Sequence, residues 1–194
     1  MKKYRLLSLI LSISIFTFCN EDKATNPDET YETVAIGNQV WMKMNLDVDH
    51  YRNGDPIPEV KSNEEWEKLT TGAWCYYNNY SVNGKTYGKL YNWYAVNDPR
   101  GLAPAGWHIP NDQEWTTLTN SLGGENVAGG KLKSTGTIEG SDGLWHSINF
   151  SATNESGFSA LPGGWRSYSN GTFDNIGYYG GWWTSSAEDR KSVV

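Results

Sequence analysis

The apolar residues of this chain come in short runs bounded by turn-forming residues, and the first pair of runs predicts a β-hairpin. Thr33–Ile36 and Gln39–Met42 are rich in apolar residues, and Gly37-Asn38 lies between them. Two apolar runs joined by two turn residues are typical of antiparallel strands with a tight turn. We therefore expect a two-stranded hairpin at residues 33–42.

The segment 62–69 has the pattern of a short helix. Ser62 and Glu65 are spaced as a capping box, in which each side chain bonds the other residue's backbone N–H. Trp66 and Leu69 then lie three residues apart, on one face.

A second helix is predicted over 112–122, with Asn111 as its N-cap and Glu114 as the capping partner. Gly123-Gly124 would end it. One apolar stripe runs along this helix, through Trp115, Leu118 and Leu122.

The other apolar runs predict short strands, and the polar, glycine-bearing segment 78–88 is expected to be a loop. The expected strands are 74–77, 89–96, 158–161, 165–168 and 177–184. Strands and helices do not alternate as they do in parallel βαβ units, so the fold class is α+β.

Composition points to one domain whose core is built from aromatic rings. The chain has 194 residues, with 10 Trp, 12 Tyr and 21 Gly. Each ring buries a large apolar area, and frequent glycine indicates many tight turns. The net charge of −6 argues against nucleic acid or an anionic membrane surface as a partner, because both need basic patches.

The N-terminus has the pattern of an export signal. A basic start, Lys2, Lys3 and Arg5, precedes an apolar run that is too short to span a bilayer and ends at Cys19. We expect residues 1–18 to be a signal peptide and 19–32 a flexible acidic tether. A signal that stops at a Cys resembles a bacterial lipoprotein signal, which predicts lipidation of Cys19 and a place on the outer membrane or cell surface. The alternative is an ordinary export signal cut further on, with Cys19 discarded.

Seven ordered motifs resemble the Fibrobacter succinogenes major paralogous domain, a family of secreted bacterial domains. They are IGNQVWMKMNL at 36–46, GAWCYYNN at 72–79, YGKLYNWYAV at 87–96, APAGWHIPNDQEWTTL at 103–118, AGGKLKSTG at 128–136, ATNESGFSALPGGWR at 152–166 and IGYYGGWWTSS at 176–186. The family is similar to C-type-lectin-like domains and to formylglycine-generating enzymes. The resemblance therefore implies two short helices packed on a small twisted antiparallel sheet, with long irregular loops.

The C-terminal end departs from that pattern. Family members usually continue to a last strand resembling G-F-S-V-R-C, whereas this chain stops eight residues after Ser186. The tail 189–194 also matches the translation of a common sequencing-adaptor oligonucleotide. We interpret residues 33–188 as an incomplete domain and 189–194 as a non-native tail. By the resemblance, Cys75 could form a disulfide with a cysteine of the missing strand; alternatively it is a buried, unpaired thiol.

The sequence does not favour an enzyme. The formylglycine-type relatives use a cysteine pair, and this domain contains only Cys75. His108 lies at the start of a predicted helix, where a structural hydrogen bond is the simpler role. No metal site or cofactor is predicted. Calcium is the one ion worth considering, since C-type lectins bind sugars through it, but Asn154-Glu155 is the nearest acidic amide pair and suits a loop cap as well.

A binding surface is the function that the sequence favours. Sugars are recognised by aromatic faces that stack on the ring, with amides and carboxylates on the hydroxyls. The candidate ligand-binding residues lie in the C-terminal loops: Trp165, Arg166, Tyr168, Asp174, Asn175, Tyr178, Tyr179 and Trp182. About half of such rings would face the core in alternating strands.

We expect the partner to be an extracellular polysaccharide or protein, with membrane contact only through the lipid anchor. The two main hypotheses are a glycan-binding or adhesive module, which predicts exposed rings clustered on one face, and a structural or protein-recognition module, which predicts a mixed polar surface. A degenerate enzyme of the formylglycine-generating type is a third, disfavoured by the missing second cysteine.

Overall fold

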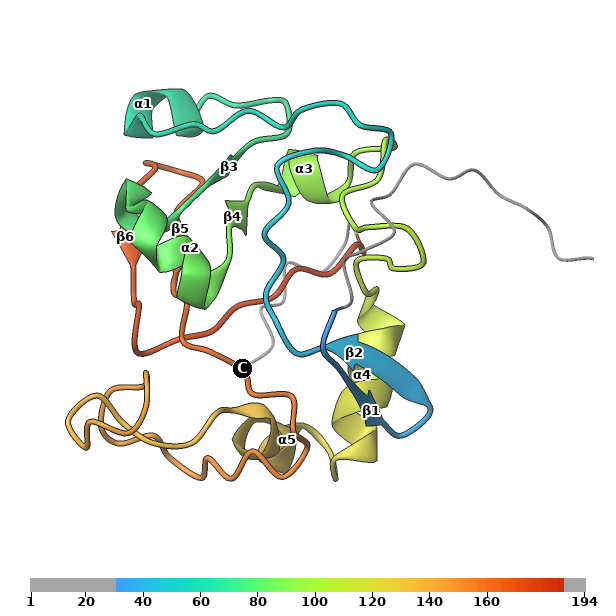
Figure 1. Ribbon diagram of the computed structural model, residues 1–194, viewed down its shortest axis with the longest axis vertical. Helices are drawn as coiled ribbons and strands as arrows, with labels where there is room; N and C mark the ends of the chain where they lie inside the picture. Colours follow the sequence, from blue (N-terminus) through green and yellow to red (C-terminus); the bar gives the residue numbers. More distant parts are fainter. Residues whose placement is uncertain (1–30, 187–194) are drawn as a thin grey trace, which may run out of the picture.

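The computed structural model describes residues 31–186 (Figure 1). The predicted signal peptide 1–18, the lipidation site Cys19, most of the tether and the tail 189–194 lie outside the described residues. Within them, no helix combines the length and the apolar character needed to cross a bilayer.

The strands of the described residues form three separate antiparallel pairs. They are β1 (Thr33–Ile36) with β2 (Gln39–Met42), β3 (Trp74–Cys75) with β4 (Leu90–Tyr91), and β5 (Trp165–Arg166) with β6 (Phe173–Asp174). The hairpin at 33–42 is confirmed, with Ile36 opposite Gln39 across the Gly37-Asn38 turn.

The helices are short and lie between the strand pairs. They are α1 (Asn63–Trp66), the 3₁₀ turn η1 (Tyr77–Asn79), α2 (Ser81–Tyr87), α3 (Trp93–Val96), α4 (Asp112–Ser121) and α5 (Glu125–Leu132). Two of these were predicted. Ser62 accepts a hydrogen bond from the backbone N–H of Glu65 at the start of α1, and Asn111 and Glu114 form the complete capping box of α4.

The helices and strands form two groups (Figure 1), and each group encloses its own buried hydrophobic residues. In the first, α4, α5 and the β1–β2 hairpin enclose Ile36, Trp115, Leu118 and Leu132. The second group contains α1, α3, β3 and β4. It has two clusters, one of which includes Tyr51, Ile57, Trp74, Tyr91, Ala95, Val96 and Leu102, and the other Val60, Trp66, Ala73 and Cys75.

The segment 182–186 joins the two groups through hydrogen bonds. The Trp183 indole donates to the carbonyl of Tyr91 in β4 at 2.9 Å, and the Trp183 carbonyl accepts from the Trp115 indole in α4 at 3.2 Å. Ser186 Oγ accepts from the backbone N–H of Asp112 at 3.0 Å. One strip of chain thus spans both groups.

Several expected elements are wrong. Residues 78–88 contain η1 and α2 instead of a loop, and 89–96 is a strand only at Leu90–Tyr91 before it turns into α3. Residues 158–161 and 177–184 form no strand, although Ala160 makes an isolated bridge with Lys133. The helix α5 was not predicted.

The coarse class, a small mixed helix and sheet domain with short antiparallel sheets, is confirmed. Within that class, the described strands form three separate two-stranded antiparallel sheets.

Candidate functional site

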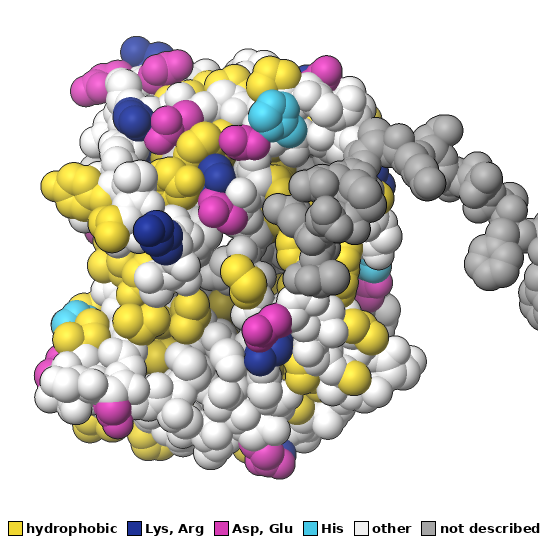
Figure 2. All heavy atoms as spheres, in the orientation of Figure 1, with side chains coloured by type: hydrophobic (Ala, Val, Ile, Leu, Met, Phe, Trp, Pro, Cys, Tyr) yellow, Lys and Arg dark blue, Asp and Glu magenta, His cyan; other side chains and the backbone are white. Residues whose placement is uncertain are grey.

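Five of the predicted ligand residues come together on β5, β6 and the turn that follows them. We call this group, Trp165, Asp174, Asn175, Tyr178 and Tyr179, the aromatic surface. Trp165 and Asp174 are directly opposite in the β5–β6 pair. The ring of Trp165 meets the ring of Tyr179 edge to face, with 5.5 Å between centroids. In Figure 2, hydrophobic side chains gather along the left of the visible face, on the side where Figure 1 places β5 and β6.

The turn 174–179 is held by backbone hydrogen bonds to a neighbouring loop. The N–H of Gly164 donates to the carbonyl of Tyr179 at 2.8 Å, and the N–H of Gly177 donates to that of Pro162 at 2.9 Å. Asn175 has a φ of +64°, in the left-handed region that asparagine tolerates better than most residues. The rings are therefore carried on a fixed backbone.

The two tyrosines of the aromatic surface are open to solvent, with Tyr178 58% and Tyr179 51% exposed. A core role would bury such rings, since each removes a large apolar area from water. Asp174 and Asn175 are also exposed and supply carboxylate and amide groups next to the rings. The arrangement combines ring faces with hydrogen-bonding groups.

His146 extends the aromatic surface and was missed by sequence reasoning. Its imidazole stacks on Tyr178, with 4.3 Å between centroids and 21° between planes. Its Nδ1 lies 2.7 Å from Glu139 Oε1, and this hydrogen bond, followed by those from the backbone of Glu139 itself and of Ser147, lowers the pKa of Glu139 to about 2. The only sequence signal was the position of His146 beside Trp145, which does not indicate a contact 32 residues away.

Tyr168 lies on the turn that joins β5 to β6, with 74% of its surface exposed. The turn is closed by hydrogen bonds between Ser167 and Thr172 and between Gly171 and Ser167. Tyr168 is thus near the aromatic surface in sequence and open to solvent.

Arg166 points the opposite way, into the protein, and cannot offer its guanidinium to a ligand. Only 9% of the residue is exposed. It donates to backbone carbonyls and to Asn63 Oδ1 at 2.6–3.2 Å; the carbonyls are those of Gly171, Val60, Lys61 and Ser62. The guanidinium also lies over the rings of Trp66 and Phe173. We therefore remove Arg166 from the ligand candidates, because alternation along β5 turns it inward.

Trp182 is also separate from the aromatic surface. Its indole donates to Asn45 Oδ1 at 3.0 Å, and its ring meets Phe158 edge to face. It lines a groove between the two groups of elements, and Figure 2 shows this face hollowed across its middle.

The groove has a volume of about 660 Å³ and mostly apolar walls. Its volume falls within the range of small-molecule sites, roughly 300–1,000 Å³. The aromatic and large apolar residues along it include Trp41, Met42, Met44, Leu46, Tyr87, Leu90, Tyr91, Leu102, Trp107, Ile109, Trp115, Phe158, Leu161, Trp182 and Trp183.

Two buried polar atoms of the groove-lining residues have no hydrogen-bond partner among the described residues. They are Gln39 Oε1 and Trp41 Nε1. Lys89 also lines the groove, where its Nζ is paired with Asp47 and lies 4.5 Å from the centroid of Trp74. Burial alone would lower the pKa of Lys89, but the hydrogen bond to Asp47 raises it, so Lys89 is a charged group and not a nucleophile.

The other polar residues singled out in the sequence have structural contacts. His108 Nε2 lies 2.8 Å from Glu114 Oε1, next to the α4 cap. Asn154 exchanges hydrogen bonds with Ser159, and Glu155 lies 3.4 Å from Lys131. Among residues 31–186, no group of three or more His, Cys, Asp or Glu could hold a metal ion.

Cys75 is fully buried, and it is an unpaired thiol in the described part of the chain. Burial raises the pKa of its thiol to about 11, although the nearby Arg166 acts in the other direction. A thiol with that pKa is protonated at neutral pH and does not act as a nucleophile.

The family profile that matches this sequence is that of the Fibrobacter succinogenes major domain, over residues 34–194. The chain belongs to this family. No curated protein and no solved structure matches it. Membership of the Fibrobacter succinogenes major domain family covers the whole of the described fold from β1 onward, including both the aromatic surface and the groove.

Proposed function

We propose that this protein is an exported binding domain that recognises an extracellular glycan through its aromatic surface. The observation that carries the proposal is that one short turn carries two exposed tyrosines, each in contact with a further ring: Tyr179 contacts Trp165, and Tyr178 stacks on His146. Lipidation at Cys19 would hold the domain on the outer membrane or cell surface, and a C-type-lectin-like arrangement is the finer fold that we propose.

Sugar recognition explains why rings and polar groups share this face. The C–H bonds of a pyranose pack on an aromatic face, while its hydroxyls need hydrogen-bond partners at fixed positions. Tyr178 and Tyr179 offer the faces, and Asp174 and Asn175 offer carboxylate and amide oxygens beside them. The backbone bonds of the turn fix these groups before a ligand arrives, which lowers the entropy cost of binding.

A glycan array probed with the full-length chain tests the proposal, followed by titration of the best polysaccharide. We expect Trp165→Ala and Tyr178→Ala each to weaken binding by about fivefold, since an aromatic contact of this kind contributes on the order of 1 kcal/mol. Tyr80→Ala is the control for loss of an exposed ring, because Tyr80 is 63% exposed and lies outside both the β5–β6 pair and the turn 174–179. Absence of binding to every polysaccharide would overturn the proposal.

The alternative is a protein-recognition module without sugar binding, and one feature favours it. Ile148 and Phe150 are 87% and 77% exposed on the loop that follows His146. Exposed apolar side chains next to a ring platform are a feature of protein interfaces. A failed glycan array, combined with a protein partner lost in Ile148→Ser but retained in Val82→Ser, would support this alternative.

A further inference from the structure

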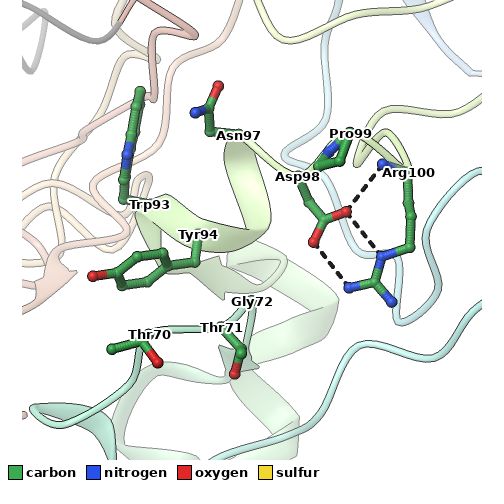
Figure 3. Close-up of a pocket in the computed structure, with 9 residues that line it drawn as sticks. All are labelled: Thr70, Thr71, Gly72, Trp93, Tyr94, Asn97, Asp98, Pro99 and Arg100. Carbon is green, nitrogen blue, oxygen red and sulfur yellow. Dashed lines mark hydrogen bonds and ion pairs between the residues drawn. The ribbon is translucent and has the colours of Figure 1, made fainter.

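A second concave site lies away from the aromatic surface, between the chain before β3 and the segment that runs from α3 to Arg100. Its volume is about 220 Å³. Figure 3 shows Thr70 and Thr71 along its lower side, Trp93, Tyr94 and Asn97 on α3 and its end, and Arg100 on the far side. We call it the α3 pocket.

Hydrogen bonds from one side chain, that of Asn92, hold the two sides of the α3 pocket together. Its Oδ1 accepts from the backbone N–H of Ala95, which caps α3, and from the N–H of Ala73, both at 3.0 Å. Its Nδ2 donates to the carbonyl of Thr71 at 2.8 Å. The two walls are therefore tied together before any ligand binds.

The charged groups of the pocket neutralise one another. Arg100 forms a two-point pair with Asp98, at 2.8 and 2.9 Å, and reaches Asp55 at 3.1 Å. Its guanidinium also lies over the ring of Tyr51, 4.0 Å from the centroid. The hydrogen bond from Arg100 lowers the pKa of Asp98 to about 2, so both partners remain charged at neutral pH. An ionic ligand would have to compete with this pair.

The remaining groups of the α3 pocket have no partner of their own. Among residues 31–186, the amide of Asn97, the hydroxyls of Thr70 and Thr71 and the phenol of Tyr94 make no side-chain hydrogen bond. The Tyr94 ring is 44% exposed, and the Trp93 ring packs on Trp183 with 5.9 Å between centroids. These residues, with their rings and open hydrogen-bonding groups, line the same small pocket.

We propose that the α3 pocket binds a single uncharged pyranose ring, as a glycan-binding subsite distinct from the aromatic surface. A neutral polyol suits the paired charges, because it uses the spare N–H groups of Arg100, the amide and the hydroxyls without breaking the ion pair. The pocket is smaller than ordinary small-molecule sites, roughly 300–1,000 Å³, so it admits one ring and not a longer oligosaccharide. This proposal does not require that the aromatic surface binds a glycan.

The test is a nitrogen-15 NMR titration of the full-length chain with the methyl glycosides of glucose, galactose, mannose and N-acetylglucosamine, one at a time. We expect at least one of them to shift the Trp93 indole and Asn97 amide signals at millimolar concentration. Tyr94→Ala should weaken that binding about tenfold, and Asn97→Ala should also weaken it, while Tyr80→Ala and Trp165→Ala leave it unchanged.

Two results would overturn the proposal. One is the absence of any shift at Trp93 and Asn97 with all four glycosides. The other is a shift that survives both Tyr94→Ala and Asn97→Ala, provided that the amide spectra of these variants show a folded protein. A response at Trp93 that Trp165→Ala abolishes would assign the binding to the aromatic surface and would also reject the α3 pocket.

Discussion

At the residue scale, Arg166 shows how a side chain selected for its chemistry can have a purely structural role. Its guanidinium supplies donors to carbonyls at the start of α1 and to the β5–β6 turn. No carboxylate among the described residues pairs with it, so carbonyl dipoles and the rings of Trp66 and Phe173 stabilise the charge. A buried arginine with this many acceptors holds the backbone in place.

Replacement of Arg166 should therefore destabilise the fold strongly. Arg166→Ala leaves the buried carbonyls of Val60 and Gly171 without a donor, and we expect a loss of about 3 kcal/mol in the free energy of unfolding. Chemical denaturation measures it. The matched control is its exposed neighbour, Trp165→Ala, for which we expect a loss below about 1 kcal/mol. Equal losses in the two variants would contradict this account.

A second residue-scale prediction concerns acid. The pKa of Glu139 in the folded chain is about 2, below its ordinary value near 4.5. A lowered pKa means that the carboxylate stabilises the fold fully above about 4.5, and that this contribution is lost as the pH falls toward 2. The stability of Glu139→Gln should accordingly fall less over that interval than the stability of the unaltered chain.

Urea denaturation at a series of pH values checks this difference. Glu125→Gln serves as the control, because it removes an α5 carboxylate that makes no side-chain hydrogen bond within the described residues. A Glu139→Gln curve parallel to that of the unaltered chain between pH 4.5 and 2 would show that the contact with His146 and Ser147 does not stabilise the fold.

At the element scale, Gly164 determines where the turn 174–179 lies. It has a φ of +63°, and a Cβ there would lie 2.5 Å from the carbonyl oxygen of Asp174 and 2.7 Å from the backbone nitrogen of Ile176. Gly164→Ala should push this turn away from β5. We expect a stability loss of about 1–3 kcal/mol and weaker glycan binding, although every side chain of the aromatic surface is retained.

Gly106→Ala is a suitable comparison for Gly164→Ala. Gly106 also has a positive φ, +81°, but nothing lies within 4 Å of its would-be Cβ. Its substitution should cost some stability and leave binding unchanged, as measured by thermal unfolding and by titration of the array ligand. Loss of binding in Gly106→Ala as well would mean that the turn is not the element responsible.

The sequence predicted the elements that carry strong local signals and missed those that depend on tertiary contacts. The hairpin at 33–42 and the capped helix α4 follow from turn and capping residues. In contrast, α2 contains Gly84, which has poor helix propensity but packs so closely on the Tyr76 ring that a Cβ would clash. The helix α5 carries two glycines, and a Cβ on Gly130 would meet the carbonyl oxygen of Ser151.

The candidate site was predicted in part for the same reason. Trp165, Asp174 and Asn175 could be grouped from their closeness in sequence, and the strand pairing places them together. The inward side of β5 could not be assigned from the sequence, because the run Trp165-Arg166-Ser167-Tyr168 is too short to show which alternate residues face the core, so Arg166 was included. His146 approaches Tyr178 through loops without a periodic pattern, and such contacts leave no signal in a single sequence.

At the scale of the whole molecule, the reactivity of the Cys75 thiol measures how often the fold unfolds. The thiol is fully buried between α1 and the sheet that contains it. In a Cys19→Ser variant, where Cys75 is the sole cysteine, we expect negligible reaction with Ellman's reagent in buffer and rapid reaction in denaturant. The rate at which the Cys75 thiol reacts with the reagent should rise in parallel with the unfolded fraction. Fast reaction without unfolding would show that this core opens locally.

The bonds that close the two groups of elements join positions far apart along the polypeptide. Arg166 reaches Val60 across 106 positions, Trp183 reaches Tyr91 across 92, and Ser186 reaches Asp112 across 74. As the ribosome releases the N-terminal half first, the aromatic residues of that half emerge before their partners exist. Because long-range contacts slow folding, we expect the two groups of elements to close only after the segment 182–186 has emerged.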